Sequence, residues 1–454
     1  MNEKNFFVRN KSILTFLILE VLALTAFNFG DISYIFALAG GFLAVVGIFF
    51  LLNVEKNKKS LLWALIPTAY LLLISIFAVA SPFAKAYSNL ENIALFISLP
   101  GFFIIGYIVR KMKDVKPKLV LLVIGGGLAA ITLFGLFSTI IEYGLFYSLI
   151  YKNKPMYYYN AETFNVTKEM YWLTGFQFNE VYVEYGSLFA VLCGAFLPGL
   201  LFLKPKEDRN EFIVCAVVGG IGLLTLLAIP NFKALLVLVV ASSIAFIYKF
   251  LKNHKKTQKI LGISFVSIVF LGLVFFSVGL IGASKGIEYQ GILKRIFVEN
   301  GIMQNVNAVF KEMFAVVDGS KINVNGMPPI EYNLEPHPFY TGTGNGIWIE
   351  TGIFEVQLLK EIGVVGTFLF FGFVLLTGYM LLRYYRHSKD SDHVKAVLLV
   401  LVLAFFIFES LFNVFSVAVH ETIIVAFIRS PLLLVVLFII GFTFIPFGEE
   451  KTNE

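Results

Sequence analysis

The sequence predicts an all-α polytopic membrane protein of about 12 transmembrane helices, with one large extracytoplasmic loop. Two features of composition support this class. Of the 454 residues, 58% are hydrophobic and only 15% are charged, whereas a soluble domain carries about 25% charged residues. The mean hydropathy is +0.82. The third observation is that apolar runs of about 20 residues, the length that a helix needs to cross a bilayer, recur along the whole chain.

The apolar runs define the expected helices. Hydrocarbon offers no partner to backbone polar groups, so a spanning segment must pair them internally, as a helix does. The expected helices cover 12–29, 32–53, 61–83, 93–109, 119–143, 181–203, 211–229, 234–248, 260–283, 355–382, 396–412 and 422–446. The shortest of them, 234–248, is expected to extend into its flanks.

The orientation follows from lysine and arginine, which are enriched in cytoplasmic loops of membrane proteins. With a cytoplasmic N-terminus, the inward segments hold 24 of the 36 basic residues in 66 positions, and the outward segments hold 10 in 132. The inward segments are 1–11, 54–60, 110–118, 204–210, 249–259, 383–395 and 447–454. This alternation predicts a multi-pass membrane protein with both termini cytoplasmic.

The chain divides into three parts. Residues 1–283 hold the first nine helices and an aromatic-rich outward loop at 144–180. Residues 284–354 form the large outward loop, which is too short for an independent domain. Residues 355–454 hold the last three helices and a cytoplasmic tail. The first apolar run lacks a small-residue cleavage site and is expected to be a retained helix.

Several chemistries lack their motifs. The sequence has no Walker loop, metal-ligand cluster, serine-hydrolase elbow or dinucleotide fingerprint. We therefore expect no cofactor and no metal. The basic balance is explained by topology, which disfavours nucleic acid as a partner. Cys193 and Cys215 both lie in apolar stretches and are expected to pack in the core.

Charged residues at the outward face are the candidates for a binding site. Lys233 lies in a tight outward turn, and Lys294 and Arg295 lie just beyond the ninth helix. An ammonium or guanidinium at the membrane surface suits a lipid phosphate, and the guanidinium fork can bind two oxygens of a diphosphate at once. The alternative is that all three are ordinary interfacial anchors that reach toward the headgroups.

Arg429 and Glu409 lie inside the last two apolar runs, at comparable depth from the outward face. Burying a charge at that depth costs free energy unless the charge is paired or faces a water-filled cavity, so it marks a candidate functional site. A purely structural ion pair between the two is the competing interpretation. Near the end of the long loop, Gly342, Gly344 and Gly346 permit positive φ or a close approach of backbone to a ligand.

Three segments, in order, resemble the O-antigen ligase and polymerase superfamily. Gly175-Phe176-Gln177-Phe178-Asn179 is similar to its G-x-F-x-x-N stretch with one residue missing, and 224–236 resembles its apolar, Ser-Arg, apolar element, with Asn231 and Lys233 near the Ser and Arg positions. Arg295, the glycines of 342–346 and the Leu358-to-Gly366 stretch resemble the R … GxG … LxxLxExGxxG ending. The hydropathy resemblance covers nearly the whole chain.

Two departures from the family pattern matter. The ligases carry a histidine about nine residues before the glutamate that aligns with Glu361, and Gly352 stands there in this chain. His337, further upstream, is the nearest histidine. The arginine of the first basic element is Lys233 here, which weakens bidentate recognition of phosphate. The missing histidine favours a polymerase over a ligase.

The resemblance implies a GT-C-like architecture and an inverting glycosyl transfer on undecaprenyl-pyrophosphate-linked oligosaccharides at the outer face of a bacterial plasma membrane. A hydroxyl of one repeat unit attacks the anomeric carbon of the other chain and expels the lipid diphosphate, with a flippase and a chain-length regulator as partners. Lys233, Lys294, Arg295 and Arg429 would neutralise the diphosphate, and Glu355, Glu350 or His337 would orient or deprotonate the hydroxyl. The remaining candidates for substrate binding are Asn179, Asn231, Gly342, Gly344, Gly346 and Glu409.

Other functions remain open at this stage. A ligase-like transfer of a glycan to another acceptor uses the same groups. A flippase or secondary transporter of lipid-linked glycans fits the helix number, although such proteins have related halves and midplane sites. An outward-facing peptidoglycan polymerase of the shape-and-division type suits the helix count less well.

Overall fold

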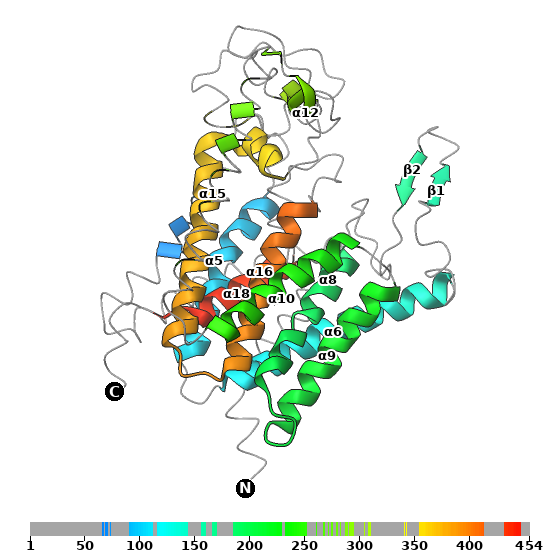
Figure 1. Ribbon diagram of the computed structural model, residues 1–454, viewed down its shortest axis with the longest axis vertical. Helices are drawn as coiled ribbons and strands as arrows, with labels where there is room; N and C mark the ends of the chain where they lie inside the picture. Colours follow the sequence, from blue (N-terminus) through cyan, green and yellow to red (C-terminus); the bar gives the residue numbers. More distant parts are fainter. Residues whose placement is uncertain are drawn as a thin grey trace.

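The computed structural model describes residues 90–111, 116–143, 156–159, 166–169, 185–228, 232–251, 354–412 and 431–445, with single positions and short stretches within 66–73, 260–309 and 340–342 (Figure 1). In these residues the chain is mostly helical, which confirms the coarse fold prediction. Two stretches, Arg209–Leu227 and Ile362–His387, are long and apolar enough to cross a membrane by length and composition.

The elements follow the predicted order closely. The helices are α5 (Leu90–Lys111), α6 (Pro117–Tyr143), α8 (Tyr185–Gly194), the 3-10 helix η3 (Leu197–Phe202), α9 (Arg209–Ala228), α10 (Phe232–Leu251), α12 (Gly291–Lys294), α15 (Phe354–His387), α16 (Asp392–Phe412) and α18 (Pro431–Thr443). As expected, α10 extends beyond 234–248 at both ends.

Prolines set several helix boundaries. Pro117 and Pro431 are first residues of α6 and α18, where the missing N–H costs nothing because it would have no intrahelical partner. The helix predicted over 181–203 is instead divided into α8 and η3. Pro198 explains the division, because its ring cannot continue an α-helix past the carbonyl four residues earlier, which belongs to Gly194, the last residue of α8.

Helix α16 is the centre of the bundle. Residues 394–402 are buried on every side of this helix, the pattern expected of a helix that is apolar all round. Helices α6, α8, α10, α15 and α18 and the η3 turn all pack against it. Two of its rings, Phe405 and Phe408, are among the largest fully buried side chains.

Glycines allow two pairs of helices to approach closely. A Cβ on Gly106 of α5 would overlap the Phe438 carbonyl of α18, and a Cβ on Gly441 of α18 would overlap the Phe103 carbonyl of α5. Gly222 of α9 meets the backbone of α8 at Ala190 and Gly194 in the same way. A close approach of helix backbones at small residues is typical of helix packing in membranes.

A short β-hairpin adds to the all-α prediction. Strands β1 (Met156–Tyr159) and β2 (Val166–Glu169) pair antiparallel within the 144–180 loop, with Tyr157 opposite Lys168 and Tyr158 opposite Thr167. The loop was identified from the sequence as rich in aromatic residues, but the two strands were not predicted. Aromatic and β-branched residues favour strands, but four-residue strands are too short to give a clear alternating pattern.

The helix ends gather in two groups. Polar contacts join the end of α5 to the α15–α16 turn, the start of α6 to the start of α9, and the end of α15 to the segment after α18. In Figure 1 the α15–α16 turn and the loop before α9 lie at the lower end, and α12 and the β1–β2 hairpin lie at the upper end. The lower group coincides with segments predicted to face inward, and the upper group with segments predicted to face outward.

Candidate functional site

The structure describes only part of the predicted site. Lys294 and Gly342 are described fully; for Lys233, Glu355 and Glu409 the backbone is described. The other candidates lie outside the described residues: Asn179, Asn231, Arg295, His337, Gly344, Gly346, Glu350 and Arg429.

Three of the predicted charged residues occupy helix ends at the upper end of the bundle. Lys233 is the second residue of α10, Glu355 is the second residue of α15, and Glu409 lies in the last turn of α16. The opposite ends of α15 and α16 meet at the lower end in the turn between them (Figure 1). The backbones of Lys233, Glu355 and Glu409 therefore all lie at or near helix ends.

Lys294 is the last residue of α12, a single helical turn that begins at Gly291 with a φ of 60°. Its side chain is exposed. An exposed lysine on a short amphipathic turn suits both hypotheses of the sequence analysis, an interfacial anchor and a phosphate ligand.

The best-defined contact at the upper end joins Gly342 to α15. Gly342 is buried and has a φ of 80°, which confirms that this glycine adopts a positive φ. Its amide nitrogen and the Tyr340 carbonyl occupy the space where Gly363 would carry a Cβ. Gly363 itself has a φ of 67° and a ψ of −178°, so α15 is broken there. The two parts of the resemblance, the loop glycines and the Leu358-to-Gly366 stretch, are thus in direct contact.

Lys360 is a buried cation that the sequence analysis placed in a helix without a role. Only 4% of the residue is exposed, which is unusual for lysine. It lies one turn before Gly363 in the first part of α15, between the fully buried residues Leu358 and Ile362. Its burial depends on tertiary packing, so no sequence signal identified it. The upper end therefore holds a buried ammonium close to the Gly342 contact.

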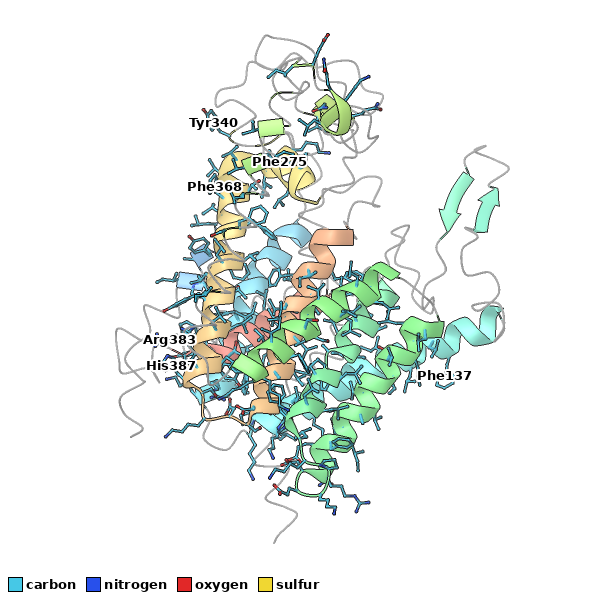
Figure 2. All side chains as sticks on the ribbon, in the orientation of Figure 1. Phe137, Phe275, Tyr340, Phe368, Arg383 and His387 are labelled. Carbon is cyan, nitrogen blue, oxygen red and sulfur yellow. The ribbon has the colours of Figure 1, made fainter. Side chains whose placement is uncertain are left out.

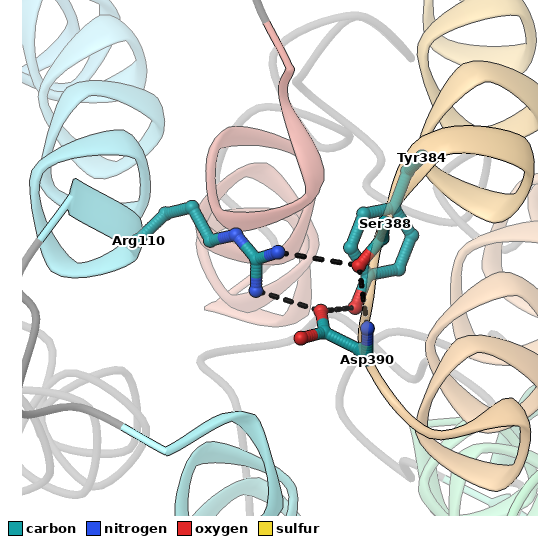
Figure 3. Close-up of polar contacts among 4 residues, drawn as sticks. All are labelled: Arg110, Tyr384, Ser388 and Asp390. Carbon is teal, nitrogen blue, oxygen red and sulfur yellow. Dashed lines mark hydrogen bonds and ion pairs between the residues drawn. The ribbon is translucent and has the colours of Figure 1, made fainter. Parts of the chain in front are cut away.

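A second polar cluster lies at the lower end (Figure 3). The Arg110 guanidinium donates to Asp390 Oδ2 at 2.6 Å and to Ser388 Oγ at 3.2 Å, and the Tyr384 hydroxyl donates to Asp390 Oδ2 at 2.5 Å. The guanidinium also lies over the rings of Tyr384 and Phe442, 5.5 and 5.3 Å from their centroids. Every group in the cluster is bonded to another, so it joins α5 to the α15–α16 turn and to α18.

Two further contacts strengthen that end. Lys118 of α6 donates to Glu211 of α9 at 2.6 Å. Arg383 Nε donates to the Ile445 carbonyl at 2.8 Å. Figure 2 shows Arg383 and His387 near one end of α15, and Tyr340 and Phe368 near the other. The polar contacts of Arg383 and of the α15–α16 turn therefore lie at the opposite end of α15 from the Gly342 contact.

His393 lies beside the Lys118–Glu211 pair, before the predicted span at 396–412. It is 3% exposed, and its Nε2 has no hydrogen-bond partner among the residues that the structure describes. Burial, with a smaller contribution from Lys118, lowers the pKa of His393, although the carboxylates of Glu211, Asp208 and Asp392 act in the opposite direction. The neutral imidazole is therefore the form that the fold favours.

Among the side chains that the structure describes, no group of three or more His, Cys, Asp or Glu residues could hold a metal ion. Cys193 and Cys215 are free and buried, which confirms the prediction that they pack in the core. No protein-family model and no curated protein matches the chain. Function is therefore inferred from the residues and their arrangement.

Proposed function

We propose that this protein is a membrane glycosyltransferase of about 12 transmembrane helices that polymerises undecaprenyl-pyrophosphate-linked repeat units at the outer face of the bacterial plasma membrane. The observation that carries the proposal is the contact between Gly342 and Gly363. It joins two separate segments of the resemblance, the loop glycines and the Leu358-to-Gly366 stretch, at the end of the bundle that also holds the Lys233, Glu355 and Glu409 backbones.

The surface of α15 supports a membrane setting. Large apolar side chains face outward along one stripe of this helix from Val365 to Leu382, and Phe368 and Leu375 are 76% and 74% exposed. At 1.5 Å per residue the stripe is about 26 Å long, close to the roughly 30 Å of a bilayer's hydrocarbon core. Exposed apolar residues recur along α9 and α10 as well. Lipid tails are the natural cover for such stripes.

The helix directions support the proposed topology. The contacts at the lower end connect the end of α5, the starts of α6 and α9, and the α15–α16 turn. All of these segments are rich in lysine and arginine, as expected at a cytoplasmic face. The upper end, with Lys233 and Glu355, then faces outward.

The proposed chemistry needs cations for the leaving group and a carboxylate for the acceptor. Lys233, Lys294, Arg295 and Arg429 would stabilise the negative charge that develops on the departing diphosphate. Glu355, Glu350 or His337 would orient or deprotonate the attacking hydroxyl. The new glycosidic bond forms as the anomeric carbon–phosphate oxygen bond breaks, with inversion at that carbon. A ligase-like transfer differs only in its acceptor.

The break in α15 is the observation that favours a second candidate, a flippase or secondary transporter, because such proteins use discontinuous helices. Their breaks lie near the membrane midplane. Gly363 instead lies before the apolar stripe, which begins at Val365. The position of the break therefore suits a surface site better than a transport site.

The test is glycan synthesis by the purified protein in lipid nanodiscs, supplied with lipid-linked oligosaccharides extracted from the source cells. We expect a ladder of products from the wild-type protein, and its loss in Lys233→Ala and Arg295→Ala. Lys206→Ala, at an exposed lysine of the loop before α9, is the matched control and should retain the ladder. Movement of lipid-linked sugar between leaflets without elongation would establish the transporter instead.

A further inference from the structure

The break in α15 is filled by another part of the chain. Gly363 is the residue of this helix with non-helical φ and ψ, and its positive φ disfavours any residue with a Cβ. A Cβ there would also overlap the Tyr340 carbonyl and the Gly342 amide nitrogen. Both conformation and space therefore require glycine at this position.

Gly342 meets the break with a matching conformation. Its own φ is 80° and it is buried, while the neighbouring Tyr340 is largely exposed. Two glycines in the left-handed region thus lie backbone to backbone. Such an approach fixes the position of one segment on the other more closely than side-chain packing does, because no flexible group intervenes.

The break divides α15 into two pieces with different surroundings. The piece at 364–387 carries the exposed apolar stripe. In the piece at 354–362, Leu358, Lys360 and Ile362 are all buried. The direction of this first piece is set at Gly363, so the contact with Gly342 also sets where Glu355 and Lys360 lie.

We propose that Gly342 and Gly363 form a clamp that positions the first piece of α15, and with it the backbone of Glu355, for the acceptor hydroxyl of lipid-linked glycans. Both glycines are positioning residues, since they act through the residues of that piece. The inference rests on the proposed function for its substrate, but the clamp itself is a structural statement that can be tested without activity.

The test compares Gly363→Ala and Gly342→Ala with Gly378→Ala. Gly378 lies in the same helix, and a Cβ there meets nothing within 4 Å. Hydrogen exchange measured in nanodiscs reports the clamp directly. We expect faster exchange at 340–342 and 354–362 in both clamp variants, with exchange at 392–412 unchanged. The control should match the wild-type protein throughout.

Glycan synthesis then reports the functional part. Misplacement of reacting groups by about 1 Å costs about 100-fold in rate, so we expect kcat to fall by at least about tenfold in the clamp variants, with a smaller change in KM. Wild-type exchange at 340–342 in both variants would overturn the clamp. Faster exchange with unchanged kcat would overturn its positioning role.

These experiments distinguish failure of the proposed function from failure of the clamp. If the wild-type protein makes no polymer, the proposed function fails while the exchange data still decide the clamp. If Gly363→Ala does not fold, Gly342→Ala and the exchange of the wild-type protein remain as tests. Rapid exchange at Gly342 in the wild-type protein, like that of an open loop, would then refute the contact.

Discussion

Replacing Asp390 by alanine should destabilise the protein by about 1.5–3 kcal/mol. The carboxylate accepts hydrogen bonds from Arg110 at 2.6 Å and from Tyr384 at 2.5 Å. A hydrogen bond to a charged group contributes about 1.5–3 kcal/mol. The Arg110 and Asp390 side chains are 21% and 11% exposed, so water replaces part of what is lost. We therefore take the loss of stability to be about half of the summed free-energy contributions of the two hydrogen bonds.

The pairwise part can be isolated by a double-mutant cycle. Arg110→Met keeps much of the apolar stem and removes the charge. We expect a coupling of about 1.5 kcal/mol between Arg110 and Asp390. The stacking of Arg110 on Tyr384 and Phe442 survives in Asp390→Ala and limits the loss.

The assay is unfolding of the detergent-solubilised protein by increasing SDS, followed by circular dichroism. Glu207→Ala is the control, because Glu207 pairs with Lys204 at 2.8 Å in an exposed position. Solvent screening leaves such an exposed pair with little effect on stability. A coupling below about 0.5 kcal/mol between Arg110 and Asp390 would refute the view that this cluster holds the helices together.

Three further predictions concern packing, pH and topology. Gly441→Leu should abolish the close crossing of α5 and α18 and prevent stable folding. Gly126→Ala is the control, because a Cβ there meets nothing within 4 Å, and its stability should be equal to the wild type or higher by up to about 1 kcal/mol. Thermal unfolding measures the stability of both variants. The lowered pKa of His393 means that its neutral form stabilises the fold fully above the unfolded pKa of about 6.5, and that this contribution is lost as pH falls from there toward the folded pKa. His393→Gln should remove that slope, and an unchanged slope would contradict the assignment. In intact cells, a membrane-impermeant maleimide should label Lys168→Cys but label Lys206→Cys only after permeabilisation, and the reverse pattern would invert the topology.

Hydropathy was sufficient to predict most helices that the structure describes. The apolar runs gave α9 and α16 to within a few residues at each end, because a long uninterrupted run of apolar residues has few alternatives to a helix. The division between α8 and η3 was missed, although Pro198 marks it. A proline inside an apolar run breaks the helix without lowering the hydropathy of the run, so hydropathy alone does not record the division.

The site was predictable only in part. The residues of the Leu358-to-Gly366 stretch were recognised, but the break at Gly363 was not, since an isolated glycine is often tolerated within a helix. Its partner Gly342 lies outside the helix, and no local pattern records such a contact. Lys360 was placed correctly in a helix, yet its burial depends on neighbours that only the fold supplies.

The two ends of the bundle differ in how their charges are used. At the lower end Arg110 and Lys118 are paired with Asp390 and Glu211, so these cations are already neutralised. Between them and the upper end, α16 has no ionisable residue from 397 to 408. Its residues 394–402 are all buried. A transporter that carried a diphosphate through the bundle would need polar groups at that depth. Charge placement therefore favours chemistry at the upper end, where the Lys233 and Glu355 backbones lie.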